Sequence, residues 1–169
     1  MLITSGMSER PMPAPPGAEN CRFAELLIAL PLWWPLKKSA ARKAGWLWPI
    51  RELRACARFP HAFDTWVWYG HTIQSSDAAS YHRSVRFNSV ALGPSYLVDP
   101  GLATLEVSPD RVVSFFALHF LYPEELQLKM RVGIDAVWDL FEKDGISEMV
   151  DPMRRNVCRP SSSPPRRGT

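Results

Sequence analysis

Some apolar residues of the chain form continuous or alternating runs, which predict strands, and others recur with helical spacing, which predicts helices. Residues 23–30 (FAELLIAL) are almost continuously apolar, which is typical of a buried strand, although Ala and Leu leave a helix open. Residues 112–122 (VVSFFALHFLY) are apolar at odd and even positions alike, so they predict a central strand covered on both faces. Residues 2–4 read as the end of a further strand.

Two more segments predict strands that carry polar positions. Residues 65–73 (TWVWYGHTI) are rich in aromatic and β-branched side chains, with Gly70 as a bulge or a close approach. In residues 85–92 (VRFNSVAL), apolar and polar positions alternate at first. This alternation predicts a strand with one face exposed to water.

The remaining apolar pattern has the period of a helix. In residues 46–59, Trp46, Ile50, Leu53 and Ala57 share one face, and Pro60 is expected to end the helix. The arginines at 51, 54 and 58 lie on another face. Residues 123–143 predict the clearest helix, with an apolar stripe, a possible division at Gly133 and a cap at Gly145. Its stripe consists of Leu126, Met130, Ile134, Val137 and Phe141.

The net charge of +3 comes from the end of the chain. Residues 151–169 hold five arginines and one acid, whereas residues 1–150 hold 15 basic and 16 acidic residues. A protein that binds nucleic acid needs Lys and Arg clustered on its folded face. The main body therefore does not have the charge of a nucleic-acid binder, and nucleic acid is not an expected partner.

Cysteine usage and hydropathy predict a protein of the cytoplasm. Three cysteines at 21, 56 and 158 form no CxxC pair and fit a reducing compartment. The longest apolar run, residues 26–34, is interrupted by Pro31 and is far shorter than the roughly 20 residues that a bilayer requires. The first residues also lack the basic and apolar regions of a signal peptide.

Common catalytic and metal-binding motifs are missing, so we predict no catalytic residue, no metal and no cofactor. The sequence contains no phosphate-binding glycine loop, no HExxH and no GxSxG. His61, Asp64, Tyr69 and His71 suggest a titratable pocket, and an enzyme that uses it stays an alternative. The simpler interpretation is that His61 caps a helix end, that His71 is hydrogen-bonded in a strand and that Cys56 is a structural thiol.

The same region supplies candidates for binding a protein. Trp and Tyr dominate the energetics of protein interfaces, so Trp66 and Tyr69 are candidate anchors, with core packing as the alternative. Arg58, His61 and His71 complete the candidate binding positions. The arginine face of the helix either contacts an acidic partner or is simply solvated.

Several segments together resemble the bacterial suppressor-of-fused domain family. These segments are SGMSERPM (5–12), AEL (24–26), ARFPH (57–61), TW (65–66), YGHT (69–72), LYPEEL (121–126) and the ending from Val150 to Cys158. Their order and spacing carry the resemblance, which covers about residues 1–158. In the family a lead-in segment precedes the strand that matches residues 2–5, so the resemblance implies a chain that is truncated or wrongly started at its N-terminus.

The resemblance implies a fold and a class of function. The fold is α+β, a single domain with a mixed β-sheet flanked by helices over residues 1–158, followed by a disordered Pro/Ser/Arg tail over 159–169. The family is not enzymatic as far as it is understood, and its bacterial members are widely interpreted as immunity proteins that neutralise toxins of polymorphic toxin systems. The resemblance therefore implies a protein partner, a toxin whose active site this chain covers. The alternative is a regulatory or scaffolding module that binds an endogenous protein or peptide, for instance by strand addition to a sheet edge.

Overall fold

Strand β6 (Arg111–Leu121) is the centre of a mixed sheet in the computed structural model, which describes residues 1–36, 45–76 and 79–159. Strand β2 (Ala24–Ile28) pairs with β6 in parallel, and β4 (Ser89–Gly93) pairs with it antiparallel. Among the described residues the sheet has six strands in the order β1-β2-β6-β4-β3, with β5 paired beside β6. The expected mixed sheet and its buried central strand are confirmed.

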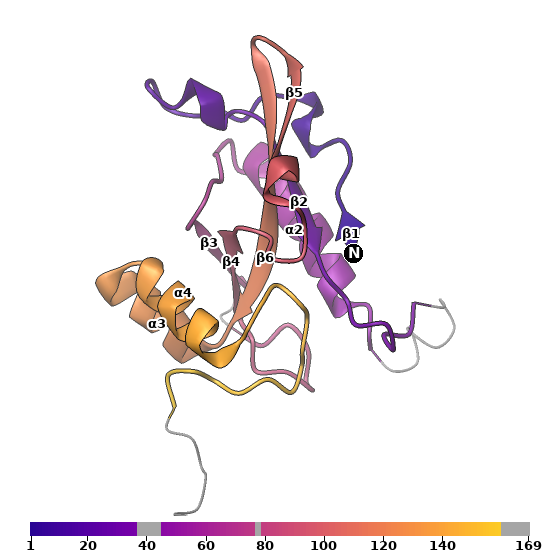
Figure 1. Ribbon diagram of the computed structural model, residues 1–169, viewed down its shortest axis with the longest axis vertical. Helices are drawn as coiled ribbons and strands as arrows, with labels where there is room; N and C mark the ends of the chain where they lie inside the picture. Colours follow the sequence, from indigo (N-terminus) through magenta and orange to yellow (C-terminus); the bar gives the residue numbers. More distant parts are fainter. Residues whose placement is uncertain (37–44, 77–78, 160–169) are drawn as a thin grey trace, which may run out of the picture.

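The other elements complete the α+β fold that the resemblance implied. The remaining strands are β1 (Leu2–Ile3), β3 (Thr72–Gln74) and β5 (Thr104–Ser108), and the helices are α2 (Trp48–Ala62), α3 (Pro123–Val132) and α4 (Asp135–Asp144). The described residues also contain three single-turn 3-10 helices, η1 (Met7–Glu9), η2 (Glu19–Cys21) and η3 (Pro100–Leu102). Helix α2 lies along one side of the sheet, whereas α3 and α4 lie at its lower end (Figure 1).

Side-chain alternation along the central strands builds a core on each face of the sheet. Phe116, Leu118 and Phe120 of β6 join the α2 side chains Trp48 and Leu53 in the larger core. On the opposite face, Leu121 of β6 and Ala91 of β4 pack with Val137, Trp138 and Phe141 of α4. Since consecutive strand residues point to opposite faces, an apolar run without alternation is what a strand needs when helices cover both of its faces.

Helix α2 differs from its prediction in where it ends and in which face is buried. It continues through Pro60 to Ala62, so the expected stop at Pro60 was wrong. Pro60 is buried, and the Phe63 N–H still donates to the Phe59 carbonyl (3.1 Å) after it. The buried residues of the helix include Trp48, Leu53 and Cys56, whereas Ile50 and Ala57 are only half-buried. The predicted arginine face is exposed to solvent.

Most of the strand predicted over residues 65–73 is an irregular segment with a turn at 69–70, called here the turn at 65–71. Strand β3 covers only residues 72–74. Before it, Gly70 has φ +75° and the His71 N–H donates back to the Trp68 carbonyl (3.0 Å), although the Gly70 N–H still donates to the Leu92 carbonyl of β4 (2.8 Å). A Cβ at Gly70 would come within 3.1 Å of Ile134 Cγ2, so the expected close approach at this glycine is real. Aromatic residues fill the core from this turn, with Trp68 4.9 Å from Phe116 between ring centroids. Packing of these side chains into the core, and not strand pairing, explains the aromatic content of this segment.

Two further predictions require correction. The strand predicted from residue 85 begins at Ser89, and all five residues of β4 are buried because both of its faces are covered, with Val90 and Leu92 in one core and Ala91 in the other. The predicted helix over 123–143 is divided at Gly133, as expected, but Met130 of its apolar stripe is exposed. Gly145 has the left-handed conformation of a helix cap, with φ +66°. The basic loop expected at 37–43 lies outside the described residues.

The C-terminal segment is held to the sheet by a buried ion pair. The two carboxylate oxygens of Glu125 accept from Arg154 Nη1 (2.8 Å) and Nη2 (2.6 Å), and their side chains are 0% and 8% exposed. Arg154 Nη2 also donates to the Phe120 carbonyl, and its guanidinium lies 4.9 Å from the ring centroid of Phe87. Residues after 159 are not described, and Arg159 itself donates from Nε to Glu124 Oε1 (3.0 Å).

His119 of β6 makes the stability of the domain sensitive to acid. His119 is buried, and its Nε2–H donates to the Pro94 carbonyl (3.0 Å). Burial, with a smaller effect of the Arg154 charge, lowers the pKa of His119 from 6.5 to about 4, against the opposing effects of the Pro94 carbonyl and Glu148. The unfolded chain therefore binds a proton below pH 6.5 that the folded protein does not bind until about pH 4.

We expect this histidine to cost about 2.5 kcal/mol of unfolding free energy between pH 7 and pH 4.5. Denaturant melts at half-unit steps of pH measure that loss. In His119→Gln, which keeps a side-chain donor and does not titrate, the slope over this range should flatten. An unchanged slope in the variant would show that other groups cause the acid sensitivity.

Candidate functional site

A groove runs between the N-terminal segment and helix α2, beside the edge strand β1. Its volume is about 830 Å³. The groove is lined by residues 2–7 together with Glu9, Arg10, Ile50, Leu53, Arg54, Ala57, Arg58, His61 and Ala62. Apolar side chains of β1 and α2 are therefore flanked by charged ones. Two of the five binding positions selected from the sequence, Arg58 and His61, lie here.

The carboxylate of Glu25, in β2, holds the N-terminal wall of this groove in place. It accepts from the Thr4 hydroxyl (2.5 Å), the Gly6 N–H (3.0 Å), and the Ser8 N–H (3.0 Å) and hydroxyl (2.8 Å). Burial alone would raise the pKa of Glu25, but these hydrogen bonds together outweigh it and leave that pKa below its usual value. The wall thus depends on a charged carboxylate.

His61 joins the end of α2 to the same wall. Its Nε2–H donates to the Met7 carbonyl (2.9 Å), 54 residues away in the sequence. Arg111 adds a second link from the sheet, because its Nη2 donates to the Ser8 carbonyl (2.8 Å). His61 therefore positions the wall rather than capping its own helix.

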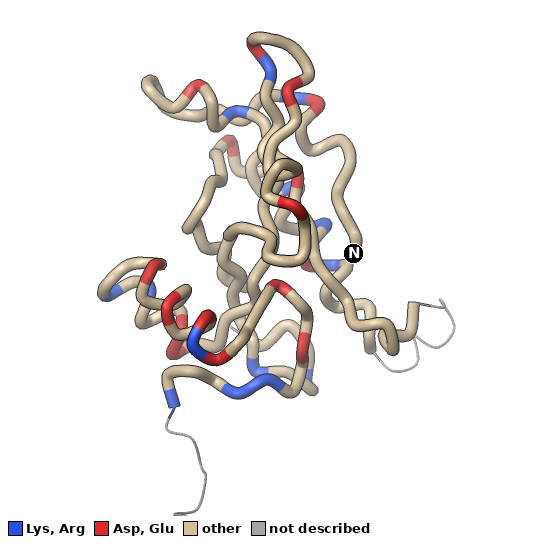
Figure 2. The backbone as a smooth tube through the Cα atoms, in the orientation of Figure 1, with Lys and Arg blue, Asp and Glu red and all other residues tan. Residues whose placement is uncertain are grey.

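Three arginines give the groove a positive rim. Arg54 and Arg58 project from the exposed face of α2, and Arg10 follows η1 on the opposite wall. Within the described part of the chain, none of these three guanidinium groups takes part in an ion pair or a hydrogen bond. Glu9 is the one acid among the lining residues. Figure 2 shows basic positions along α2, behind the sheet and beside the N-terminal segment.

A second hollow, of about 430 Å³, adjoins the groove and contains two members of the enzyme hypothesis. His61 and Asp64 line it, together with Arg10, Arg22 and the loop at residues 11–13. No hydrogen bond joins His61 to Asp64 in the described structure, and His61 Nε2 is already bound to Met7. Tyr69 and His71 lie outside this hollow. The geometry therefore does not assemble the four residues into one site.

The aromatic candidates lie on the turn before β3, away from the groove lining. The rings of Trp66 and His71 are 4.7 Å apart between centroids, in an edge-to-face arrangement. Burial, and then the nearby Lys129 charge, lower the pKa of His71, although its hydrogen bond to the Trp66 backbone acts in the opposite direction. Tyr69 is 43% exposed, whereas Trp66 is half-buried. Of these three, Tyr69 is the one available to a partner.

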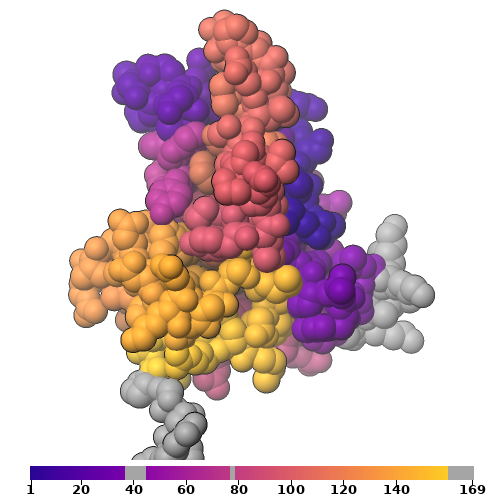
Figure 3. All heavy atoms as spheres, viewed as in Figure 1, coloured from indigo at the N-terminus to yellow at the C-terminus, as the bar shows by residue number. Residues whose placement is uncertain are grey.

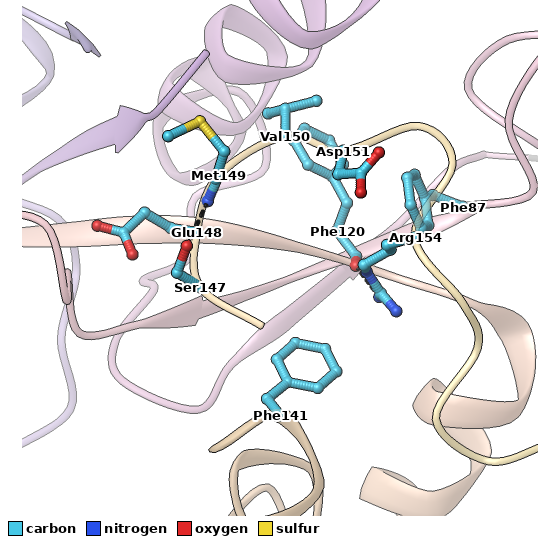
Figure 4. A pocket seen from close by; sticks show the side chains of 9 residues that line it. All are labelled: Phe87, Phe120, Phe141, Ser147, Glu148, Met149, Val150, Asp151 and Arg154. Atoms are coloured by element: carbon cyan, nitrogen blue, oxygen red, sulfur yellow. Dashed lines mark hydrogen bonds between the residues drawn. The ribbon is translucent and has the colours of Figure 1, made fainter. Parts of the chain in front are cut away.

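A third hollow surrounds Arg154 and is too small for a ligand. Figure 4 shows Phe87, Phe120 and Phe141 around it, with residues 147–151 along one side. Its volume of about 10 Å³ leaves room for no more than one water molecule. The guanidinium there is already satisfied by Glu125 and the Phe120 carbonyl. This hollow is therefore a packing feature around the ion pair and not a ligand site.

The remaining candidate chemistry has structural explanations. Burial, and then the Glu52 charge, raise the pKa of the Cys56 thiol to about 12, so it is not a nucleophile at neutral pH. Across residues 1–36, 45–76 and 79–159, no group of three or more His, Cys, Asp or Glu side chains is placed to hold a metal ion. In the same ranges no helix combines the length and the apolar character needed to cross a membrane.

Sequence reasoning identified Arg58 and His61 but missed the groove itself. The arginine face of α2 was visible in the helical spacing, whereas nothing in the spacing placed residues 2–10 opposite it. Glu25 was also missed, although a lone acid within an apolar run is a signal of a buried, hydrogen-bonded carboxylate.

Comparison with known proteins identifies the family. The model of the Suppressor of fused protein (SUFU) family matches residues 1–155. The chain belongs to the suppressor-of-fused family. A comparison with curated proteins found no match.

Solved structures of the family share the fold at low sequence identity. A SUFU homologue from Neisseria gonorrhoeae FA 1090 aligns with a TM-score of 0.62 and 15% identity, covering 92% of this chain and 68% of the homologue. The structure of a Sufu–Fu complex aligns with a TM-score of 0.50 and 18% identity, covering 66% of this chain and 46% of the matched chain. Drosophila Suppressor of Fused aligns with a TM-score of 0.51 and 19% identity, covering 66% of this chain and 25% of the Drosophila chain. At these identities the likeness concerns the fold.

Proposed function

We propose that this chain is a protein-binding domain that acts by covering a surface of its partner and has no catalytic turnover of its own. The observation that carries the proposal is the groove, where an apolar floor beside an open strand edge is flanked by three arginines without partners among the described residues. Apolar contact supplies affinity in such a site, and charge selects the partner. A family member solved in complex with another protein, Fu, supports the same class of function.

The finer proposal is that the partner is a toxin and the chain is its immunity protein. Neutralisation by occlusion needs a preformed surface, and hydrogen bonds with Glu25, His61 and Arg111 hold the N-terminal wall of the groove in place. A preformed wall lowers the ordering entropy lost on binding, which favours tight stoichiometric complexes. Tyr69 is a candidate anchor outside the groove.

Co-purification from the source cells tests the function. We expect the tagged full chain to retain one protein at 1:1 stoichiometry by native mass spectrometry. The variant Arg54→Glu/Arg58→Glu should recover at least tenfold less of it. The matched control is Arg83→Glu/Arg86→Glu, which reverses two exposed arginines outside the groove lining and should recover the wild-type amount.

The identity of the retained protein separates toxin from regulator. Expression of a toxin alone arrests growth, and co-expression of this chain should restore growth, whereas the groove variant should not. A retained protein without toxicity would favour the regulatory module. Equal recovery by the groove variant would contradict the assignment of the groove, and a reaction catalysed by the purified chain would contradict the function.

A further inference from the structure

The hairpin formed by β5 and the start of β6 projects from the body of the protein as an arm. We use "the arm" for residues 104–112. All five residues of β5 are exposed, and Figures 1 and 3 show the hairpin extending beyond the rest of the fold at one end. Within the described chain, β5 pairs with β6 alone, so its outer edge is open. An exposed edge of this kind is a template for pairing with another strand.

Backbone alternation shows which groups the two open edges present. The Phe115 N–H donates to the Ala103 carbonyl, so in the antiparallel ladder residues 103 and 105 face β6, and Thr104 and Glu106 face outward. In β1, the Thr4 N–H donates to the Leu26 carbonyl, which leaves Ile3 facing away from β2. Both edges therefore have backbone donors and acceptors directed to solvent.

The side chains of the arm match the apolar part of the groove. Leu105 and Val107 are 53% and 54% exposed, and Ile3 in the groove is 52% exposed. Large apolar side chains exposed together on a projecting strand indicate an interaction surface. The groove offers apolar contacts from Leu2 of β1 and Ile50 of α2.

The charges of the two surfaces are opposite. The arm carries Glu106 and Asp110, and both are exposed. Its one basic residue, Arg111, is turned back onto the body, where it donates to the Ser8 carbonyl and lies over the Phe23 ring. The groove presents Arg10, Arg54 and Arg58 against Glu9. An acidic strand with exposed apolar side chains is the complement of this groove.

We propose that the arm of one copy docks in the groove of a second copy, with β5 adding to the open edge of β1. Because every copy carries both surfaces, a reciprocal exchange of arms closes a two-fold dimer, and a one-way contact extends into a chain of copies. One contact then pairs the open edge of β5 with the open edge of β1 and brings the acidic residues of the arm next to the arginines of the groove. The second copy and the partner of the proposed function would occupy the same groove, so self-association is measured on the purified chain without that partner.

Substitutions that reverse the charge of each surface, singly and then in a mixture, test the proposal. Sedimentation velocity of the full chain from 1 to 200 µM should show concentration-dependent association. Either Glu106→Arg/Asp110→Arg or Arg54→Glu/Arg58→Glu alone should weaken the apparent dissociation constant at least tenfold. An equimolar mixture of the two variants should restore association to within about threefold of wild type, because each arm then meets a groove of opposite charge.

A matched control reverses two exposed acids of α4, Asp139→Arg/Glu142→Arg, and should associate like the wild type. Circular dichroism melts establish that every variant is folded. A wild-type chain that stays monomeric at 200 µM would overturn the proposal. Association that the single-surface variants retain, or that the mixture fails to restore, would overturn it as well.

Discussion

Replacing Glu125 by Gln should lower the free energy of unfolding by about 3–5 kcal/mol, because it leaves a buried guanidinium without its counter-charge. The Glu125 carboxylate accepts from both terminal nitrogens of Arg154, from the Tyr122 N–H (2.9 Å) and from the Val157 N–H (3.1 Å). It therefore joins the first turn of α3 to the segment that ends the described chain. Urea unfolding followed by tryptophan fluorescence measures the loss.

A double-mutant cycle isolates the ion pair from these other contacts. In Glu125→Gln/Arg154→Met the unpaired charge is removed, so we expect the double variant to be less destabilised than the sum of the two single variants by more than 1 kcal/mol. The more exposed pair of Arg159 and Glu124, whose side chains are 58% and 33% exposed, is the matched control, and Glu124→Gln should cost less than about 1 kcal/mol. Additive effects of Glu125→Gln and Arg154→Met would contradict the buried pair.

Replacing Glu25 by Gln should release the N-terminal wall of the groove, with a loss of about 2–4 kcal/mol. Four donors from Thr4, Gly6 and Ser8 converge on the carboxylate, and an amide presents one oxygen and two N–H groups to them. Amide hydrogen exchange should therefore accelerate at Gly6 and Ser8 before the sheet unfolds. The exposed Glu9→Gln, in the same groove, serves as the control and should stay within about 0.5 kcal/mol of wild type.

The same wall should respond to acid. Because the pKa of Glu25 is lowered in the folded protein, its contribution is fully present above the ordinary glutamate pKa of about 4.3 and is lost as the pH falls through the lower folded value. Exchange at Gly6 and Ser8 that is unchanged in Glu25→Gln would show that the wall is held by other contacts.

The sequence predicted the central sheet well because burial on both faces leaves a simple pattern. The uninterrupted apolar run of β6 and the position of β2 were read directly from it. The turn at 65–71 was misread as a strand, since aromatic content reports burial and does not distinguish a packed turn from a ladder. Pro60 was misread as a stop because one lost hydrogen bond is offset when the proline ring is buried.

The candidate site was predictable only in part, because it forms between segments distant in the sequence. Arg58 and His61 could be selected from the chain, but their partners across the groove come from residues 2–10. Helical spacing describes one face of one element and contains no information on what lies opposite. Tyr69, Trp66 and His71 were grouped with them by proximity in sequence, and the structure separates the two sets.

Hydrogen exchange of the chain alone and in its co-purified complex tests the central claim most directly, namely that the groove is where this domain holds a protein partner. The account predicts slower exchange on binding at residues 2–10 and 50–62, which form the two sides of the groove. Protection confined to other segments, such as the turn at 65–71, with residues 2–10 and 50–62 unchanged, would contradict it.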